Sequence, residues 1–232
     1  MTIASVAALG GFALTTIATN HVSAATLGGL TAESLGAWVL PGGAGVPTMA
    51  AWDNFARADG TNLNGQATGD NGPAWQVVSG TWTTSANAGK LSVNARDAAL
   101  VVDCGATNAT VTATITLPAN GNFSAGLALK QGTAGFLSVE YGHGNSGNIE
   151  IARTLSGSRQ VLASVTNLGR NSPATLAATY LDGTVTVQLN GVSRLSATLD
   201  SATEAVYRPH TRFGLSADND SLSTFDNFRC ET

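Results

Sequence analysis

Apolar and polar residues alternate along most of the chain after residue 80. In Val111-Thr-Ala-Thr-Ile-Thr-Leu117 the apolar residues occupy the odd positions, and Val185-Thr-Val-Gln-Leu189 repeats the pattern. A period of two places one face of a β-strand in a core and the other in water. Patterns of this kind predict strands at residues 80–84, 90–95, 99–104, 110–117, 124–131, 136–141, 148–154, 160–166, 175–181, 184–189, 193–199, 211–217 and 223–230.

Short turns separate these predicted strands. Asp182-Gly183 and Asn190-Gly191 are strong signals for two-residue β-hairpins. Many short strands with regular turns favour an all-β fold, an antiparallel sandwich. Asp53-Asn54-Phe55 opens this region and Asp226-Asn227-Phe228 closes it. We expect the two segments to lie on neighbouring strands that seal the sandwich.

The first fifty residues differ from the rest, because they are almost uncharged. Before Asp53 the only titratable side chains are His21 and Glu33, in a segment rich in Ala, Gly and Leu. Disordered tails are normally polar and charged, so an apolar arm favours burial against another protein chain. The sequence therefore predicts two parts, an assembly arm with a linker at residues 1–49 and a β-sandwich at residues 50–232.

Local structure within the arm is only partly readable. Thr31 is placed to cap a short helix that Pro41 ends. Upstream, the spacing of the apolar residues fits a helix, whereas the β-branched residues around Thr15 fit a strand, and both alternatives stay open. The residues predicted to mediate assembly are Leu9, Phe12, Leu14, Ile17, Leu35 and Trp38.

Charge and composition exclude several classes. The net charge is −4 and charged residues make up 11% of the chain, so the basic surface of a nucleic-acid-binding protein is not expected. The arm lacks the positive n-region of a signal peptide and the cationic flanks of a membrane span. We therefore expect that the protein does not bind nucleic acid and that the arm does not span a membrane.

Several motifs of the body resemble one family when taken together. The stretch Asp53-Asn-Phe-Ala-Arg-Ala-Asp-Gly60 is followed by Gly80-Thr-Trp82, then by Phe213-Gly-Leu215 and the closing Asp226-Asn-Phe228. The pattern resembles the concanavalin A-like (laminin-G-like) jelly-roll domains that occur in minor tail and other virion proteins of tailed phages, over roughly residues 50 to 232. The resemblance implies a structural module, in some cases one that binds glycans.

A catalytic site is not expected. Glucanases of this fold carry Glu-x-Asp-x-x-Glu on one strand, and glycoside cleavage needs paired carboxylates at a fixed separation. The glutamates of the body are Glu140, Glu150, Glu204 and Glu231, and none has that spacing. Glu140 and Glu150 can approach across a hairpin, but such charges more often mark a solvated face.

Two other motifs have an alternative explanation. Residues 142–147, Gly-His-Gly-Asn-Ser-Gly, match a dinucleotide fingerprint, but a strand pattern follows where that motif needs a helix. Asp218 and Asp220 offer oxygen ligands for Ca²⁺, although a turn closed by Asx hydrogen bonds is the simpler interpretation. No other cofactor is expected.

Aromatic residues are the candidates for contact with a glycan. Trp52, Trp75 and Trp82 are interpreted mainly as core or edge residues near the start of the sandwich. Tyr141, His143 and Asn145 lie at the tip of the predicted glycine-rich hairpin, and we expect them to be exposed and to contact glycan.

Cys104 ends one predicted strand and Cys230 lies near the end of the last, so the two are candidates for a disulfide. An exposed virion surface permits such a bond, whereas assembly in a reducing cytosol opposes its early formation.

Two functional hypotheses follow. The first is a virion structural protein, of the phage tail or outer surface, that assembles as a homo-oligomer or with other virion proteins and displays a sandwich to cell-surface glycan. The second is a secreted bacterial carbohydrate-binding module.

Overall fold

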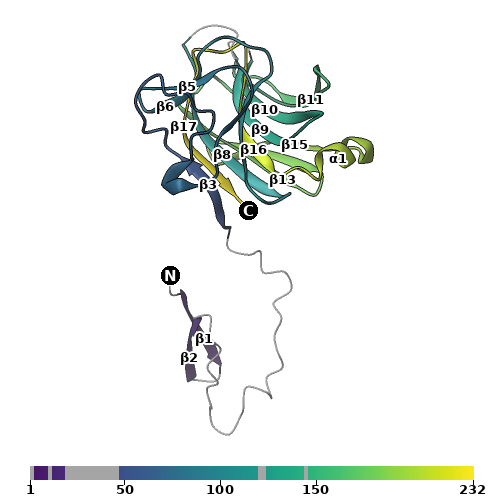
Figure 1. The fold of residues 1–232 in the computed structure, drawn as a ribbon. Coiled ribbons are helices and arrows are strands. Elements are labelled where there is room, and N and C mark those ends of the chain that lie inside the picture. The colour runs from purple at the N-terminus through teal and green to yellow at the C-terminus, as the bar shows by residue number, and fades with distance from the viewer. Residues whose placement is uncertain (1–2, 10–11, 19–46, 120–123, 144–145) are drawn as a thin grey trace. The chain divides into compact units, whose positions relative to one another are not determined.

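The computed structural model describes residues 3–9, 12–18, 47–119, 124–143 and 146–232. Its contacts divide the chain into two units, Met1–Gly45 and Val46–Thr232. The second unit is a sandwich of two antiparallel β-sheets (Figure 1). The predicted all-β jelly-roll sandwich is therefore confirmed.

The first sheet contains seven strands. Its strands β9 and β16 lie side by side although a long stretch of the chain, from Gly132 to Arg212, separates them. The order across the sheet is β12 (Ser158–Val165), β11 (Asn148–Leu155), β10 (Gly135–His143), β9 (Ser124–Gly132), β16 (Arg212–Asp218), β7 (Ala98–Asp103) and β4 (Gln76–Ser79).

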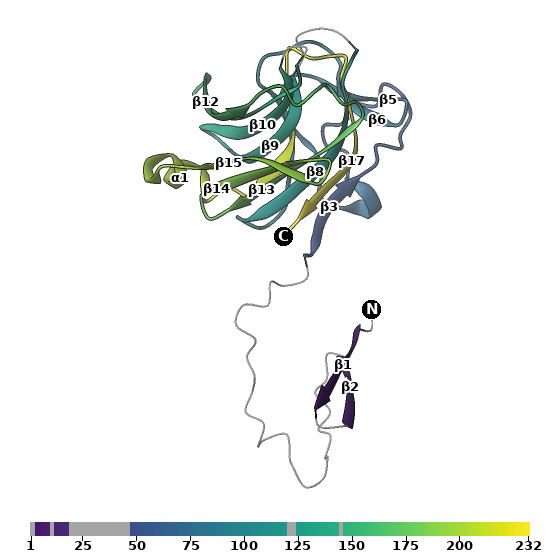
Figure 2. The same cartoon turned by 180° about the vertical axis from the view of Figure 1, so that it is seen from behind.

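The second sheet contains eight strands. Seven of them follow one another in a single path, and the eighth, β3 (Met49–Asp53), pairs with β17 beside that path. Figure 2 labels its strands together with several strands of the first sheet. The order is β15 (Val192–Thr198), β14 (Thr184–Leu189), β13 (Ala174–Leu181), β8 (Ala109–Thr116), β17 (Thr224–Glu231), β6 (Ala88–Leu91) and β5 (Trp82–Ser85) along its hydrogen-bonded neighbours.

Most strands and hairpin turns of the sandwich were predicted from the alternation of apolar and polar residues and from the residues at the turns. Asp182 and Asn190 both have positive φ, at 44° and 52°, and each is followed by a glycine with positive φ, as a type I′ hairpin requires. The strand β4, the 3-10 helix η2 (Gly69–Asn71) and the helix α1 (Ser201–Tyr207) were not predicted. Asp200 caps α1 by accepting a hydrogen bond from the backbone N–H of Thr203 at 2.9 Å.

The repeated Asp-Asn-Phe segments are neighbours, as expected. On β3 and β17, Asp53 lies directly opposite Phe228. Phe228 and Phe55 are both fully buried, and each packs against Trp75, with ring centroids 4.8 Å and 5.8 Å away. The two segments therefore close the core around one tryptophan.

The sandwich also contains an unusual buried cation. Lys130 on β9 is fully buried, and its Nζ lies 4.7 Å from the centre of the Tyr180 ring. Nζ donates to the backbone carbonyls of Thr107 at 2.7 Å, Arg208 at 2.9 Å and His210. Burial lowers the pKa of Lys130 to about 8. These contacts join β9 to the β7–β8 turn and to the segment that follows α1.

Cys104 and Cys230 form a disulfide, as the sequence suggested, with Cα atoms 6.6 Å apart. Cys104 follows β7 of the seven-stranded sheet, and Cys230 lies on β17 of the eight-stranded sheet. The bond therefore joins the two layers of the sandwich.

The N-terminal unit contains a β-hairpin of β1 (Ile3–Leu9) and β2 (Phe12–Ala18), with Leu9 opposite Phe12. Of the two alternatives for this stretch, the structure has the strand. The predicted helix after Thr31, with Leu35 and Trp38, lies outside the described residues.

Candidate functional site

Trp52 is the tryptophan that the sandwich leaves partly exposed. The strand β3 alternates, so that Ala51 and Asp53 point into the core and Trp52 points outward. Trp52 lies directly opposite Arg229 on β17. Trp75 and Trp82 are fully buried, as predicted for core residues.

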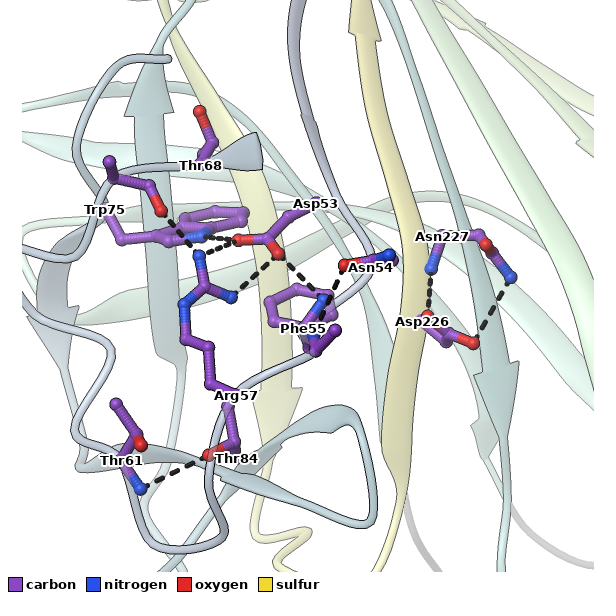
Figure 3. A network of polar contacts seen from close by, with 12 residues as sticks. Asp53, Asn54, Phe55, Arg57, Thr61, Thr68, Trp75, Thr84, Asp226 and Asn227 are labelled. Carbon is purple, nitrogen blue, oxygen red and sulfur yellow. Dashed lines mark hydrogen bonds and ion pairs between the residues drawn. The ribbon is translucent and has the colours of Figure 1, made fainter. Parts of the chain in front are cut away.

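A buried carboxylate fixes the segment beside Trp52 (Figure 3). Asp53 is 1% exposed, and its two oxygens accept hydrogen bonds from both terminal nitrogens of Arg57, each at 2.8 Å. The indole Nε1 of Trp75 donates to the same carboxylate at 2.6 Å, and the N–H of Phe55 donates at 2.7 Å. Arg57 also donates to the carbonyl of Ala67. A bidentate, charge-assisted pair is a strong and geometrically specific contact, so it holds residues 54–75 in place beside β3.

The 3-10 helix η2 packs directly on Trp52. A Cβ atom at Gly69 would lie 2.5 Å from Cε2 of the indole, so only glycine allows this approach. A hollow of about 470 Å³ lies beside the indole. Its lining is mostly polar and consists of Trp52, Asp53, Asn54, Ala56, Arg57, Ala67, Thr68, Gly69 and Asn71.

A second hollow, of about 400 Å³, lies on the outer face of the same sheet, beside Arg229. It coincides with an irregularity in the pairing of β17 with β8, between Asp226 and Arg229, where Asn227 has a φ of 50°. Its lining contains hydroxyl, amide and charged groups, from Thr112, Thr114, Thr175, Asn227, Arg229 and Glu231. Trp52 and Arg229 therefore separate two polar hollows.

The predicted glycan contact at the hairpin tip is not formed as expected. Tyr141 is fully buried, because it shares the inward face of β10 with Leu137 and Val139. Its hydroxyl donates to the carbonyls of Gly169 and Asn171, both at 3.0 Å. The Tyr141 ring thus cannot stack on a sugar. His143 ends β10, and Asn145 lies outside the described residues.

Glu140 and Glu150 do meet, on the outward side of the same hairpin. They are directly opposite on β10 and β11, and Arg159 binds both, at 3.0 Å and 2.9 Å. Glu140 is 2% exposed and also accepts hydrogen bonds from the hydroxyls of Ser124 at 2.7 Å and Ser138 at 2.9 Å. The two carboxylates are thus members of an ion-pair network.

Asp97 faces this network from the segment before β7. Burial, and then the nearby carboxylates of Asp218 and Glu140, raise the pKa of the Asp97 carboxyl. The hydroxyl of Thr154 donates to it at 3.3 Å. The sequence did not indicate this proximity, because more than forty residues separate Asp97 from Glu140 in the chain.

The predicted Ca²⁺ ligands serve the turn instead. Asp220 is fully buried, and its carboxylate accepts from the N–H groups of Leu222 at 3.0 Å and Ser223 at 2.8 Å, and from the Ser223 hydroxyl. Asp218 accepts from the N–H of Asp97 at 3.4 Å. Within the described part of the chain, no three His, Cys, Asp or Glu residues group to hold a metal ion. The contacts of Asp220 are those of a turn closed by Asx hydrogen bonds, which is the simpler of the two interpretations of this segment.

Comparisons with known proteins establish the fold alone. No protein-family model matches the chain, and no curated protein matches it. Among solved structures, the carbohydrate-binding module CBM66 from Bacillus subtilis aligns with a TM-score of 0.54 at 16% identity, over 68% of this chain and 95% of that one. The GH43 protein BlXynB from Bacillus licheniformis aligns with a TM-score of 0.57 at 15% identity, over 78% of this chain and 39% of that one. The Crh5 transglycosylase aligns with a TM-score of 0.51 at 12% identity, over 81% of this chain and 88% of that one.

The chain thus shares the jelly-roll β-sandwich fold of these structures. Within the described ranges, no helix has the length and apolar character needed to cross a membrane.

Proposed function

We propose that the sandwich is a non-catalytic carbohydrate-binding module, and that the N-terminal segment attaches it to a larger assembly. The observation that carries the proposal is the position of Trp52, partly exposed between two polar hollows of about 470 and 400 Å³. Small-molecule sites combine an aromatic surface with a few placed polar groups. Sugars present apolar C–H faces and hydroxyls, which suit an indole ring and the amide, hydroxyl and guanidinium groups around it.

The proposal of binding without cleavage is supported by the ion pairs on the other sheet. Glycoside hydrolysis needs one carboxyl as acid and a second carboxylate as base or nucleophile. Glu140 and Glu150 are both held by Arg159, and two serine hydroxyls occupy Glu140 further. This engagement favours a structural role for the pair.

We further propose that the assembly is a virion, with the sandwich displayed on the tail or outer surface. This extends the resemblance to phage tail domains and the uncharged character of residues 1–49. The partners are then further copies of this chain or other virion structural proteins. The disulfide that joins the two sheets suits an oxidising exterior.

The same disulfide also suits a secreted carbohydrate-binding module, which is the second candidate. The native mass and the mature N-terminus distinguish the two. A large complex whose chains retain Met1 supports the virion protein. A monomer that begins near Ala25 supports the secreted module.

A glycan array tests the binding function. The full-length chain and a chain beginning at Val46 are applied to an array of polysaccharides and oligosaccharides. We expect both to bind the same glycans, and the full-length chain to bind more tightly because several copies act together. Absence of binding by both chains would refute the carbohydrate-binding role.

A further inference from the structure

We propose that an uncharged, extended glycan lies across the strands of the eight-stranded sheet, along a row formed by Trp52, Arg229, Thr112, Ala177 and Gln188. We refer to these five residues as the Trp52 row. The inference rests on the proposed carbohydrate-binding function and specifies its ligand class and the surface that holds it.

The pairing register places the five residues in one line. Trp52 lies opposite Arg229, and Arg229 opposite Thr112. Thr112 lies opposite Ala177, and Ala177 opposite Gln188. Each residue therefore comes from a different strand, in the order β3, β17, β8, β13 and β14, which lie side by side (Figure 2). With neighbouring strands about 4.8 Å apart, the row extends for about 19 Å. A single sugar ring is shorter than this line, so the row suits a chain of several sugars.

The row presents the groups that an extended glycan needs. The indole of Trp52 forms one end, and the guanidinium of Arg229 and the amide of Gln188 are exposed. Ala177 has no polar side chain and keeps the middle of the row low. The hollow of about 400 Å³ opens between Thr112, Thr114 and Thr175, directly beside the row.

The threonine hydroxyls along β8 differ in how they are used. Thr110 and Thr179 form the next outward-facing pair on β8 and β13 beside the row. Their hydroxyls are hydrogen-bonded to each other at 2.8 Å. Within the residues that the structure describes, the hydroxyls of Thr112 and Thr114 have no protein partner. They are free to exchange hydrogen bonds with sugar hydroxyls.

The charge of the surface favours a neutral ligand. On β8, β13 and β14 the described outward positions carry no charge, and they are Thr110, Thr112, Thr114, Thr116, Thr175, Ala177, Thr179, Leu181, Thr184, Thr186 and Gln188. On β17, Arg229 and Glu231 are both on the edge of the hollow and have opposite charges. Asp226, opposite Thr114 on the same strand, adds one more carboxylate. The surface therefore has no excess of positive charge that would select an acidic glycan.

Titration calorimetry with the full-length chain tests the row. The probes are neutral gluco- and xylo-oligosaccharides of two to six residues, and oligogalacturonides of the same lengths as the acidic series. Affinity for one neutral series should rise with length and level off once the glycan spans the row. Trp52→Ala should weaken binding about tenfold or more, and Thr112→Val and Gln188→Ala about threefold each. Thr198→Ala, on the same face at the far edge strand β15, is the matched control and should leave the affinity unchanged.

The outcomes separate this inference from the function on which it rests. Neutral glycans that bind the wild type and Trp52→Ala equally would refute the row and leave the carbohydrate-binding function intact. Binding restricted to oligogalacturonides would refute the neutral ligand. If no oligosaccharide and no polysaccharide on the array binds the wild type, the proposed function itself fails. Circular dichroism and urea unfolding of each variant confirm that a lost affinity does not come from lost folding.

Discussion

The indole Nε1 of Trp75 donates a 2.6 Å hydrogen bond to the carboxylate of Asp53, in the core of the sandwich. Both residues are almost fully buried, and Arg57 forms an ion pair with the same carboxylate. Figure 3 shows how this contact joins the first strand of the sandwich to the segment that carries Trp75. Asp53 is therefore both a strand residue and the acceptor that holds residues 54–75 beside Trp52.

We expect Asp53→Asn to destabilise the sandwich by about 3 kcal/mol, because it removes one partner of a buried, hydrogen-bonded ion pair. Urea unfolding monitored by tryptophan fluorescence measures the change as a lower midpoint.

The matched control is Asp226→Asn in the second Asp-Asn-Phe segment. Its carboxylate accepts hydrogen bonds only from the adjacent Asn227, at 2.7 Å and 3.3 Å, among the described contacts. A change within about 0.5 kcal/mol is expected there. Equal losses of unfolding free energy at both positions would show that the contacts of Asp53 with Arg57 and Trp75 do not stabilise the sandwich.

The disulfide should contribute several kcal/mol to stability. It connects residues separated by 126 positions, and the chain-entropy model assigns about 4 to 5 kcal/mol to a loop of that order. The Cys104→Ala/Cys230→Ala double variant should unfold at correspondingly lower urea. Mass spectrometry of the native protein under non-reducing conditions gives the independent check, and two free thiols would contradict the bond.

Lys130 should make stability depend on pH in the alkaline range. Its pKa is about 8 in the folded chain and 10.5 in the reference state, so the unfolded chain binds the proton more strongly. Stability therefore rises with pH from about 8 to 10.5, by up to about 3 kcal/mol, and the cost of the buried charge is complete below that window.

The test measures the unfolding free energies of the wild type and of Lys130→Met from pH 7.5 to pH 10. We expect the difference between the two to change over this range as Lys130 loses its proton. The chain contains one other lysine, Lys90 on β6, which lies in a less buried position. Lys90→Met is the matched control for the loss of a lysine at a less buried position. A flat difference for Lys130→Met would show that burial does not weaken proton binding at Lys130.

The contrast between Val111 and Tyr141 shows what alternation can and cannot predict. Val111, Ala113 and Ile115 on β8 are fully buried, as their period of two indicated. The same period places Tyr141 on the inward face with Leu137 and Val139, but the glycine-rich turn that follows favoured an exposed interpretation. Here the residue pattern was the better guide than the position near a turn.

Other features depend on information that a local pattern does not contain. Leu127 and Leu129 point inward, so strict alternation along β9 predicts that the next residue, Lys130, points outward. The backbone at Lys130 instead has a φ of 57°, beside register shifts on both flanks of β9, and the side chain enters the core. The meeting of Trp52 with Arg229 likewise depends on the pairing of β3 with β17, and not on either sequence segment alone.

The helix α1 could have been recognised. Asp200 and Glu204 stand at the N-cap and in the first turn, where a carboxylate is favourable. With seven residues the helix is too short to show a clear helical period in its apolar residues. These two carboxylates were therefore the sequence signal that could have predicted it.

Removal of the N-terminal unit should separate folding from assembly. A chain beginning at Val46 retains β3 and the complete described core of the sandwich. We expect its thermal unfolding midpoint to remain within a few degrees of the full-length value, and its native mass to fall to that of a monomer. Assembly that proceeds equally well without residues 1–45 would contradict the assembly role of this segment.

The central claim is that the sandwich binds carbohydrate without cleaving it. The most direct test incubates the full-length chain with the polysaccharide that binds best on the array, and measures bound polysaccharide and new reducing ends in the same sample. The account predicts retention of the polysaccharide, with reducing ends no higher than in a protein-free blank. Sugar release that Glu140→Gln or Asp97→Asn abolishes would contradict it and identify the Glu140 network as an active site.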